Sequence, residues 1–219
     1  AYAYLGFAYL TRAYEEADQK QTFLNYAVEA LNNVKGYELV KEFRTMFDGS
    51  RKNNPESIFE IQFSMTSDNG ALYRSQFHQW MGASEIEGWD EIIPTQILMD
   101  EFMKEGEIAS TGRYDTRLYE TIWFQCDYFN DGNGRVWGWE YDERFVNDNG
   151  PYNRPVFRKF LPPTADEMWQ SNTAINIPLM RYANVMLMKA EALNELGRSD
   201  EAISLINEIR DVHGDMPAM

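Results

Sequence analysis

Aromatic rings and small polar side chains occur together in the middle of this sequence. The chain has 6 Trp and 13 Tyr, and aromatic residues make up 15% of it. Such rings stack on the apolar C–H faces of ligands such as sugars, while polar groups bind the hydroxyls. The mixture is densest between residues 127 and 139. The candidate ligand contacts are Trp80, Trp89, Trp137, Trp139, Tyr141 and Trp169, with Asn130, Asp131, Asn133 and Arg135. The alternative for each tryptophan is a role as a core or loop anchor.

Catalytic chemistry has no comparable support in the sequence. A glycosidase needs two carboxyl groups about 5–9.5 Å apart, and no motif singles out such a pair among the many acidic residues. His78 and His213 are isolated, so they do not indicate a catalytic triad. Glycine-rich phosphate loops are missing from the sequence. We therefore expect a binding protein rather than an enzyme, and we assign no catalytic residue.

Metal and cofactor sites are not expected either. The single cysteine, Cys126, can form neither an internal disulfide nor a zinc cage by itself. The segment 127–134 is rich in Asp, Asn and Gly, but it does not have the alternating ligands and final Glu of a calcium loop. A solvated turn is the expected structure there.

The charge balance limits the classes of partner. The formal net charge is −15, from 20 basic and 35 acidic side chains. Such a chain repels phosphate backbones and anionic lipid, so nucleic-acid binding is not expected. No run approaches the ~18 apolar residues of a membrane helix, and no signal peptide is recognisable. Because the first residues already follow a helical pattern, we expect both ends to be truncated and any localisation signal to lie outside this fragment.

The spacing of apolar residues predicts a mostly α-helical single domain, residues 1–219, in three parts. Residues 1–36 form a helix pair, and 181–214 form a second pair with the small and apolar positions of a tetratricopeptide-like repeat. The two pairs are expected to pack together as a scaffold. Residues 37–180 form a long irregular insertion on the ligand side. It contains a short strand near 57–63 and a helix near 94–104.

Several segments carry a resemblance to a known family. Residues 181–197 read RYANVMLMKAEALNELG, which is very similar to the signature of the SusD/RagB family of outer-membrane nutrient-binding lipoproteins. The continuation through 206–210 is also similar, as is the Glu-Ser-Ile-Phe-Glu strand within 54–61. Residues 114–118 resemble the family's Asp-Pro-Arg element, with Thr116 in place of proline. Residues 158–160 resemble its Arg-Lys-Tyr/Phe segment.

The resemblance implies a fold and a role. Family members have four tetratricopeptide-like helix pairs and a variable ligand-binding side. They are lipid-anchored in the outer membrane, at the cell surface, through a segment outside this fragment. They deliver glycan to a SusC-like TonB-dependent transporter. Two alternatives remain open: a peptide-binding member of the same family, and a tetratricopeptide protein–protein adaptor.

Overall fold

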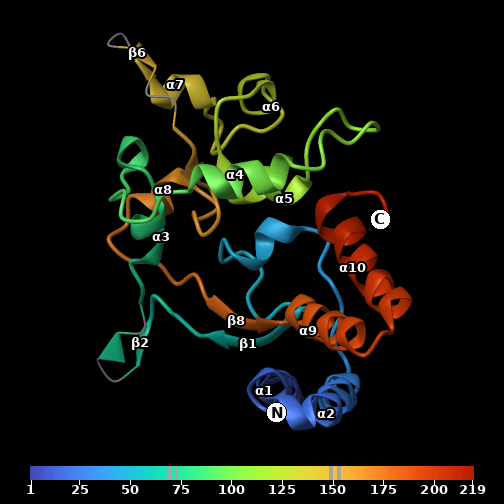
Figure 1. The fold of residues 1–219 in the computed structure, drawn as a ribbon. Helices are drawn as coiled ribbons and strands as arrows, with labels where there is room; N and C mark the ends of the chain where they lie inside the picture. The colour runs from blue at the N-terminus through green and yellow to red at the C-terminus, as the bar shows by residue number, and fades with distance from the viewer. Residues whose placement is uncertain (69–70, 73, 148–149, 152–153) are drawn as a thin grey trace. The chain divides into compact units, whose positions relative to one another are not determined.

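The computed structural model describes residues 1–68, 71–72, 74–147, 150–151 and 154–219. It is mostly helical, as predicted (Figure 1). The chain forms two compact units. The helical unit comprises residues 1–41, 53–60 and 178–219, and the aromatic unit comprises 42–52 and 61–177. Most of the expected insertion, residues 37–180, therefore folds as a compact body, whereas its residues 37–41, 53–60 and 178–180 belong to the helical unit. None of the helices within the described ranges is long and apolar enough to cross a membrane.

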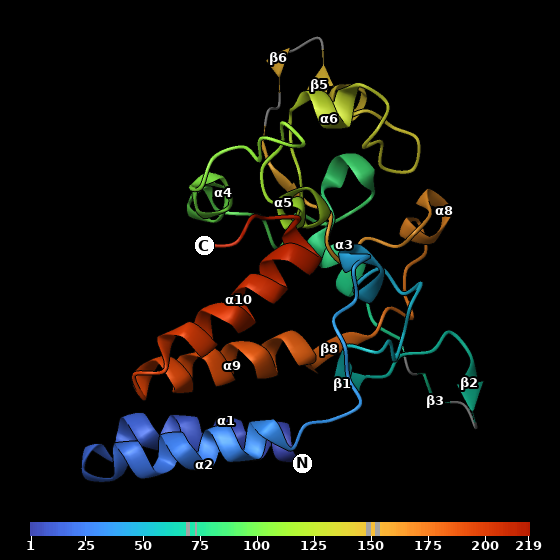
Figure 2. The ribbon, with the colours of Figure 1, turned by 90° about the vertical axis from the view of Figure 1, so that its right-hand side faces the viewer.

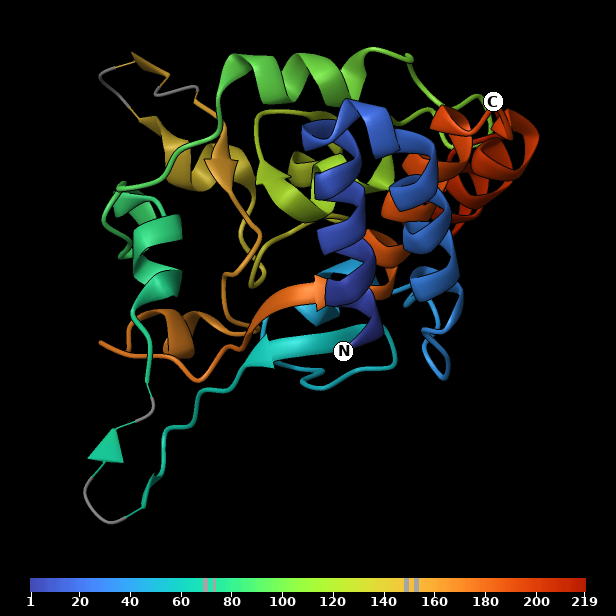
Figure 3. The ribbon, with the colours of Figure 1, turned by 60° about the horizontal axis from the view of Figure 1, so that its bottom comes forward.

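The helical unit contains long helices and a two-stranded sheet. Figure 2 shows α1 beside α2 and α9 beside α10, and Figure 3 shows β1 and β8 side by side in opposite directions. The turns between paired helices include a 3-10 turn at Ala17–Gln19 and Gly197, whose φ of 77° favours glycine. The elements are α1 Tyr2–Glu15, α2 Lys20–Asn32, β1 Ser57–Ile61, β8 Ile177–Arg181, α9 Tyr182–Glu195 and α10 Ser199–Gly214.

The first and last helix pairs pack together, which confirms the prediction from the sequence. Leu10, Leu24 and Leu193 belong to one buried apolar cluster that joins the two pairs. Polar contacts cross the same interface. The Tyr14 hydroxyl donates a 2.7 Å hydrogen bond to Glu191, and Lys20 forms a 2.6 Å ion pair with Glu195.

Two apolar stripes are less buried than the sequence pattern suggests. Leu187 on α9 is 47% exposed and Ile203 on α10 is 38% exposed. On β1 the alternation is real, but Phe59 is 51% exposed while Glu60 is only 6% exposed. The Glu60 carboxylate accepts a 3.2 Å hydrogen bond from the backbone N–H of Asn53, which gives this acidic residue a partner inside the fold.

A fully buried carboxylate, Glu56, holds the helical unit together at the base of its sheet. One oxygen accepts hydrogen bonds from the Val40 N–H (2.9 Å) and the His213 ring (2.8 Å). The other accepts from the Arg181 guanidinium at 2.6 Å. The backbone carbonyl of Glu56 also accepts from the Tyr182 N–H at 2.8 Å. One side chain thereby joins the loop before β1, the start of α9 and the end of α10.

The aromatic unit is built from short elements around a core of rings. Trp123, Phe129, Tyr141 and Phe145 are fully buried there. Strands pair only briefly, as in the antiparallel match of Ile122 with Phe157. The elements are 3-10 turns Phe43–Met46 and Ser84–Ile86; strands β2 Ser67–Asp68, β3 Ala71–Leu72, β4 Ile122–Trp123, β5 Val146–Asn147, β6 Gly150–Pro151 and β7 Val156–Phe157; and helices α3 Phe77–Met81, α4 Gln96–Met103, α5 Thr116–Thr121, α6 Asp127–Asn130, α7 Tyr141–Phe145 and α8 Ala165–Met168.

The helix predicted near 94–104 is present as α4. Its first residue is Gln96, and the Thr95 hydroxyl accepts a 3.2 Å hydrogen bond from the Leu98 N–H. Pro94 precedes this cap and is buried. The helix start predicted at Pro94 is therefore correct to within two residues. The helix begins after Thr95 because the threonine hydroxyl satisfies one of the first free N–H groups.

Replacing Glu56 tests its structural role. Glu56→Gln removes the buried negative charge and with it the ion pair between Glu56 and Arg181. We expect a loss of about 3–5 kcal/mol in the free energy of unfolding, measured by urea denaturation. Glu201→Gln, in an exposed pair with Arg198, serves as the control and should leave the midpoint unchanged. Equal midpoints for wild type and Glu56→Gln would contradict the role.

Acid should remove the same stabilisation. Burial alone raises the pKa of Glu56, but the His213 hydrogen bond, the Arg181 charge and the Val40 N–H outweigh it and hold the pKa below the ordinary 4.5. A carboxyl with a lowered folded-state pKa stabilises the fold above its unfolded pKa, and this contribution disappears as pH falls through the folded value. The difference in unfolding free energy between wild type and Glu56→Gln should therefore shrink below about pH 4.5, in urea titrations from about pH 7 to about pH 3.

Candidate functional site

Three of the predicted tryptophans lie on the surface of the aromatic unit. Trp80 is 45% exposed, Trp89 is 43% exposed and Trp169 is 58% exposed. Large indole side chains usually bury most of their area, so such exposure marks a candidate contact surface. We call these three residues and the segments that carry them the tryptophan surface.

Hydrogen bonds fix the segments of Trp80 and Trp89 to one another. The Trp89 N–H donates to the Gln79 carbonyl at 2.8 Å, and the Ile92 N–H donates to the Trp80 carbonyl at 3.0 Å. The approach between the two segments requires glycine at Gly88, because a Cβ there would lie 2.0 Å from the Gly82 carbonyl oxygen. Both tryptophans therefore stand on a close-packed base.

The segment of Trp169 is joined to α3. Ser75 and Thr173 exchange backbone hydrogen bonds of 3.0 and 2.7 Å, and the His78 ring lies 2.9 Å from the Gln170 carbonyl. Burial lowers the pKa of His78, so the ring is neutral. Since a carbonyl only accepts, Nε2 carries the proton and donates it to Gln170. His78 thus has a structural partner beneath the tryptophan surface.

Arg154 restrains the loop around Trp89 through two ion pairs. Arg154 forms ion pairs with Glu85 at 3.1 Å and with Asp90 at 2.5 Å. These carboxylates lie on either side of Trp89 in the sequence, so the pairs restrain the loop that presents its ring. Burial raises the pKa of Asp90, but hydrogen bonds from Ser84 and Arg154, together with the Arg154 charge, outweigh it and hold this pKa below its ordinary value.

Trp137 and Trp139 are partly buried against the aromatic core. The Trp137 indole N–H donates a 2.9 Å hydrogen bond to the Pro162 carbonyl. The guanidinium of Arg144 lies 3.4 Å from the centre of the Trp139 ring and covers one face. Both rings already have intramolecular partners, so they fit the alternative role of loop anchors.

Three other predicted contacts are engaged within the fold. Tyr141 has no exposed surface, and its hydroxyl donates a 2.6 Å hydrogen bond to the Arg154 carbonyl. It is a core residue, and the prediction of ligand contact is withdrawn. Asn130 is partly buried and accepts a 3.0 Å hydrogen bond from the Asp142 N–H. Arg135 is exposed but forms an ion pair with Glu140.

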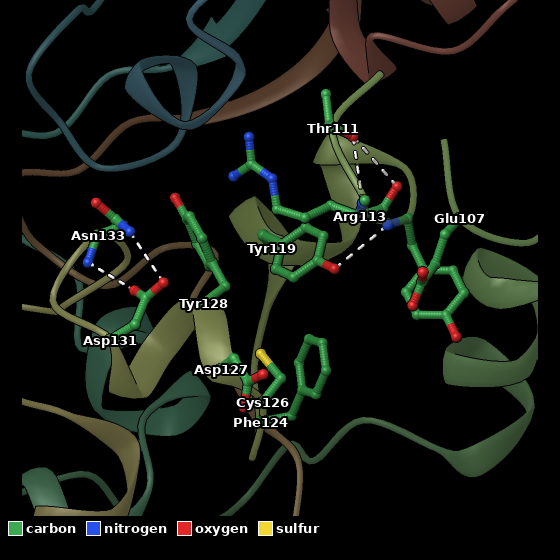
Figure 4. A pocket seen from close by; sticks show the side chains of 12 residues that line it. Glu107, Thr111, Arg113, Tyr119, Phe124, Cys126, Asp127, Tyr128, Asp131 and Asn133 are labelled. Carbon is green, nitrogen blue, oxygen red and sulfur yellow. Dashed lines mark hydrogen bonds between the residues drawn. The ribbon is translucent and has the colours of Figure 1, made fainter. Parts of the chain in front are cut away.

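Asp131 and Asn133 line a separate cavity, which we call the tyrosine pocket (Figure 4). Its volume is about 700 Å³, within the usual range for small-molecule sites. Its walls come from the loop between α4 and α5, from α5, and from α6 with the turn that follows. The lining residues include Glu107, Arg113, Tyr119, Phe124, Cys126, Asp127, Tyr128, Asp131 and Asn133.

Packed rings and one guanidinium shape the tyrosine pocket. Tyr119 and Tyr128 meet edge to face with ring centres 5.0 Å apart. The Arg113 guanidinium lies 4.8 Å from the centre of the Tyr128 ring and 5.9 Å from that of Tyr119. The Tyr119 hydroxyl accepts a 3.3 Å hydrogen bond from the Tyr114 N–H. Gly134 is needed beside this wall, since a Cβ there would lie 2.4 Å from the Tyr128 ring.

The titratable groups of the pocket have defined states at neutral pH. Burial raises the pKa of both Tyr119 and Cys126, so the hydroxyl and the thiol stay protonated. The N–H groups of Asn133 lower the pKa of Asp131, which therefore carries a negative charge. Cys126 is partly buried, as predicted.

Sequence reasoning missed Arg113, Tyr119 and Tyr128 as pocket residues. No single segment contains all three, and tertiary packing brings the Tyr119 ring, the Tyr128 ring and the Arg113 guanidinium together. The useful signal was the run of Asp and Asn after Tyr128, which led to Asp131 and Asn133. Across the described ranges, no three His, Cys, Asp or Glu side chains are grouped as metal ligands.

Comparison with known proteins identifies relatives of the chain. A model of the SusD family matches residues 55–214. SusD-like protein P38 of Formosa agariphila is 61% identical over 186 aligned residues, which cover 75% of this chain and 31% of that protein. The chain thus spans about a third of the length of this curated relative.

Solved structures with the same fold are also known. A SusD superfamily protein from Bacteroides vulgatus is 27% identical, with a TM-score of 0.73, and the match covers 97% of this chain and 42% of that one. A SusD-like carbohydrate binding protein from Bacteroides fragilis is 18% identical, with a TM-score of 0.66, over 91% of this chain and 45% of that one.

The contrast between exposed and buried aromatic side chains predicts different effects of mutation. Tyr141→Phe removes the buried hydrogen bond that the Tyr141 hydroxyl donates to the Arg154 carbonyl, so we expect a loss of about 1–3 kcal/mol in unfolding free energy. Trp169→Ala, at an exposed position, should change it by less than about 0.5 kcal/mol. Urea denaturation of both variants measures this, and a larger loss for Trp169→Ala would show that its ring is part of the core.

Proposed function

The chain belongs to the SusD family, and from this premise we propose that it is the glycan-binding part of a surface nutrient-capture protein. The tryptophan surface makes the main contacts in this proposal. The observation that carries it is the exposure of Trp80, Trp89 and Trp169, by 43–58%, on segments that hydrogen bonds hold together.

The chemistry of the tryptophan surface suits a sugar chain. Indole rings stack on the C–H faces of pyranose rings, and amide side chains bind hydroxyls. Exposed amides of Gln76 and Gln170 lie on the same two segments as Trp80 and Trp169. The base beneath is rigid, so little side-chain and loop freedom is lost when a ligand binds.

The similar proteins support a binding role. The Bacteroides fragilis protein with this fold is described as carbohydrate binding. Binding without turnover is therefore proposed here. The two histidines, which sequence reasoning set aside, have structural partners: His78 contacts Gln170 and His213 contacts Glu56.

The wider role is part of the same proposal. As in the family, the whole protein is held by a lipid anchor at the outer surface of the outer membrane and passes glycan to a SusC-like TonB-dependent transporter. A net charge of −15 favours an uncharged ligand over a phosphate-rich one.

Substitution of the exposed tryptophans tests the proposal. Trp80→Ala, Trp89→Ala and Trp169→Ala should each weaken binding of a soluble oligosaccharide on the order of tenfold, because one stacking ring is lost. Calorimetry over a panel of neutral oligosaccharides measures the affinity, and chromatography of the recovered sugar checks its length. Tyr2→Ala, which removes an aromatic side chain that is 52% exposed in the helical unit, is the matched control and should bind normally.

Two results would contradict the proposal. Unchanged affinity for the oligosaccharide in all three tryptophan variants would show that glycan does not bind at this surface. Shortening of the oligosaccharide by the purified protein would indicate an enzyme. If peptides bind and saccharides do not, the peptide-binding alternative replaces the proposal.

A further inference from the structure

The tyrosine pocket is distinct from the tryptophan surface. In Figures 1 and 3, α3 and α8 lie at one end of the aromatic unit, and the loop between α4 and α5 lies at the other. Resting on the proposed glycan function, we infer that this pocket is a second saccharide site, which prefers sugars with a protonated amino group and rejects anionic sugars.

The size and floor of the pocket suit a sugar unit. A volume of about 700 Å³ is enough for a short saccharide. The floor is apolar and well packed, since Tyr119 is 6% exposed and Phe124 is 8% exposed. Polar groups of Thr111, Asp131 and Asn133 stand at the more exposed rim and can bind hydroxyls.

The aromatic walls favour positive charge. The negative face of an aromatic ring attracts a cation within about 6 Å of its centre. Arg113 already uses this attraction at both Tyr128 and Tyr119, at 4.8 and 5.9 Å. In Figure 4 its side chain passes above Tyr119 to reach Tyr128. These ring faces are already covered by the guanidinium of Arg113, so the attraction for a sugar ammonium comes from the carboxylates of the lining.

The carboxylates of the pocket strengthen this preference. The lining carries three carboxylates, those of Glu107, Asp127 and Asp131, and one guanidinium, that of Arg113, so its formal charge is −2. Asp131 is held by Asn133 through two 2.9 Å hydrogen bonds. In the described part of the chain, Glu107 and Asp127 are exposed and form no ion pair, so both remain available to an ammonium group.

An anionic sugar meets the opposite conditions. A carboxylate on the ligand is repelled by Glu107, Asp127 and Asp131, and the guanidinium of Arg113 is shared with two rings and lies near Asp131. Because the rim is open to water, the effect on affinity is moderate and decreases as salt is added.

One oligosaccharide in three charge forms tests the inference. The probes are a β-1,4-linked glucosamine tetrasaccharide, its N-acetylated form and its N-succinylated form, which are cationic, neutral and anionic. Calorimetry with the whole chain at low salt should give an affinity for the amine about five- to tenfold above that of the neutral form, with the anionic form weakest. Raising the salt to about 0.5 M should reduce the spread.

Variants assign the effect to the pocket. The double substitution Glu107→Gln with Asp127→Asn should remove most of the preference for the amine. The control is Glu101→Gln with Asp100→Asn, on exposed positions of α4. It makes the same change in net charge outside the pocket, so the preference for the amine should remain. If both double variants lose the preference for the amine equally, the effect is not local to the pocket and the inference is contradicted.

The remaining outcomes separate the two proposals. If the three forms bind equally and Trp169→Ala still weakens them, the pocket inference fails and the proposed function stands. Tightest binding of the anionic form likewise overturns the inference alone. If no form and no other oligosaccharide binds, the proposed function fails and the inference fails with it.

Discussion

The structure of the helical unit depends on the buried carboxylate of Glu56. The backbone passes between the two units after residues 41, 52, 60 and 177. Glu56 binds Val40, just before the first of these points, and Arg181, just after the last. It also binds His213 near the end of α10. A buried charge is costly unless it is fully paired, so this arrangement is stable only when all three partners are in place. The loop before β1, the start of α9 and the end of α10 are therefore held together at this one carboxylate.

The aromatic unit is organised differently, because none of its described helices or strands is longer than the 8 residues of α4. Its short elements bury a cluster of rings, including Trp123 and Tyr141, and these rings take the place of regular secondary structure. Aromatic side chains are suited to this since each buries a large area with few rotatable bonds. The same residue types then serve two purposes. Rings that face inward make the body rigid, and the exposed rings of the tryptophan surface are available to a ligand on that rigid base.

The sequence predicted what depends on local periodicity. The helix pairs at 1–36 and 181–214 follow repeating apolar positions, and β1 follows simple alternation, so their existence was readable. Local patterns did not predict whether each aromatic side chain points into the core or toward solvent. The ring of Tyr141 lies within the core, and the rings of Trp137 and Trp139 are partly buried against it. The isolated Trp169 is the most exposed tryptophan. The pairing of Glu56 with His213 spans 157 residues, and no local pattern contains such a contact. The tyrosine pocket was missed for the same reason, since its walls are set by tertiary packing.

The most direct test of glycan capture by the tryptophan surface uses the indole N–H signals of the 6 tryptophans. The protein is labelled with nitrogen-15 at tryptophan and titrated with the oligosaccharide that binds best in calorimetry. The account predicts that the signals of Trp80, Trp89 and Trp169 shift and saturate together, while buried Trp123 is unaffected and the sugar keeps its length. Shifts confined to Trp137 and Trp139, or a sugar that is cleaved during the titration, would contradict it.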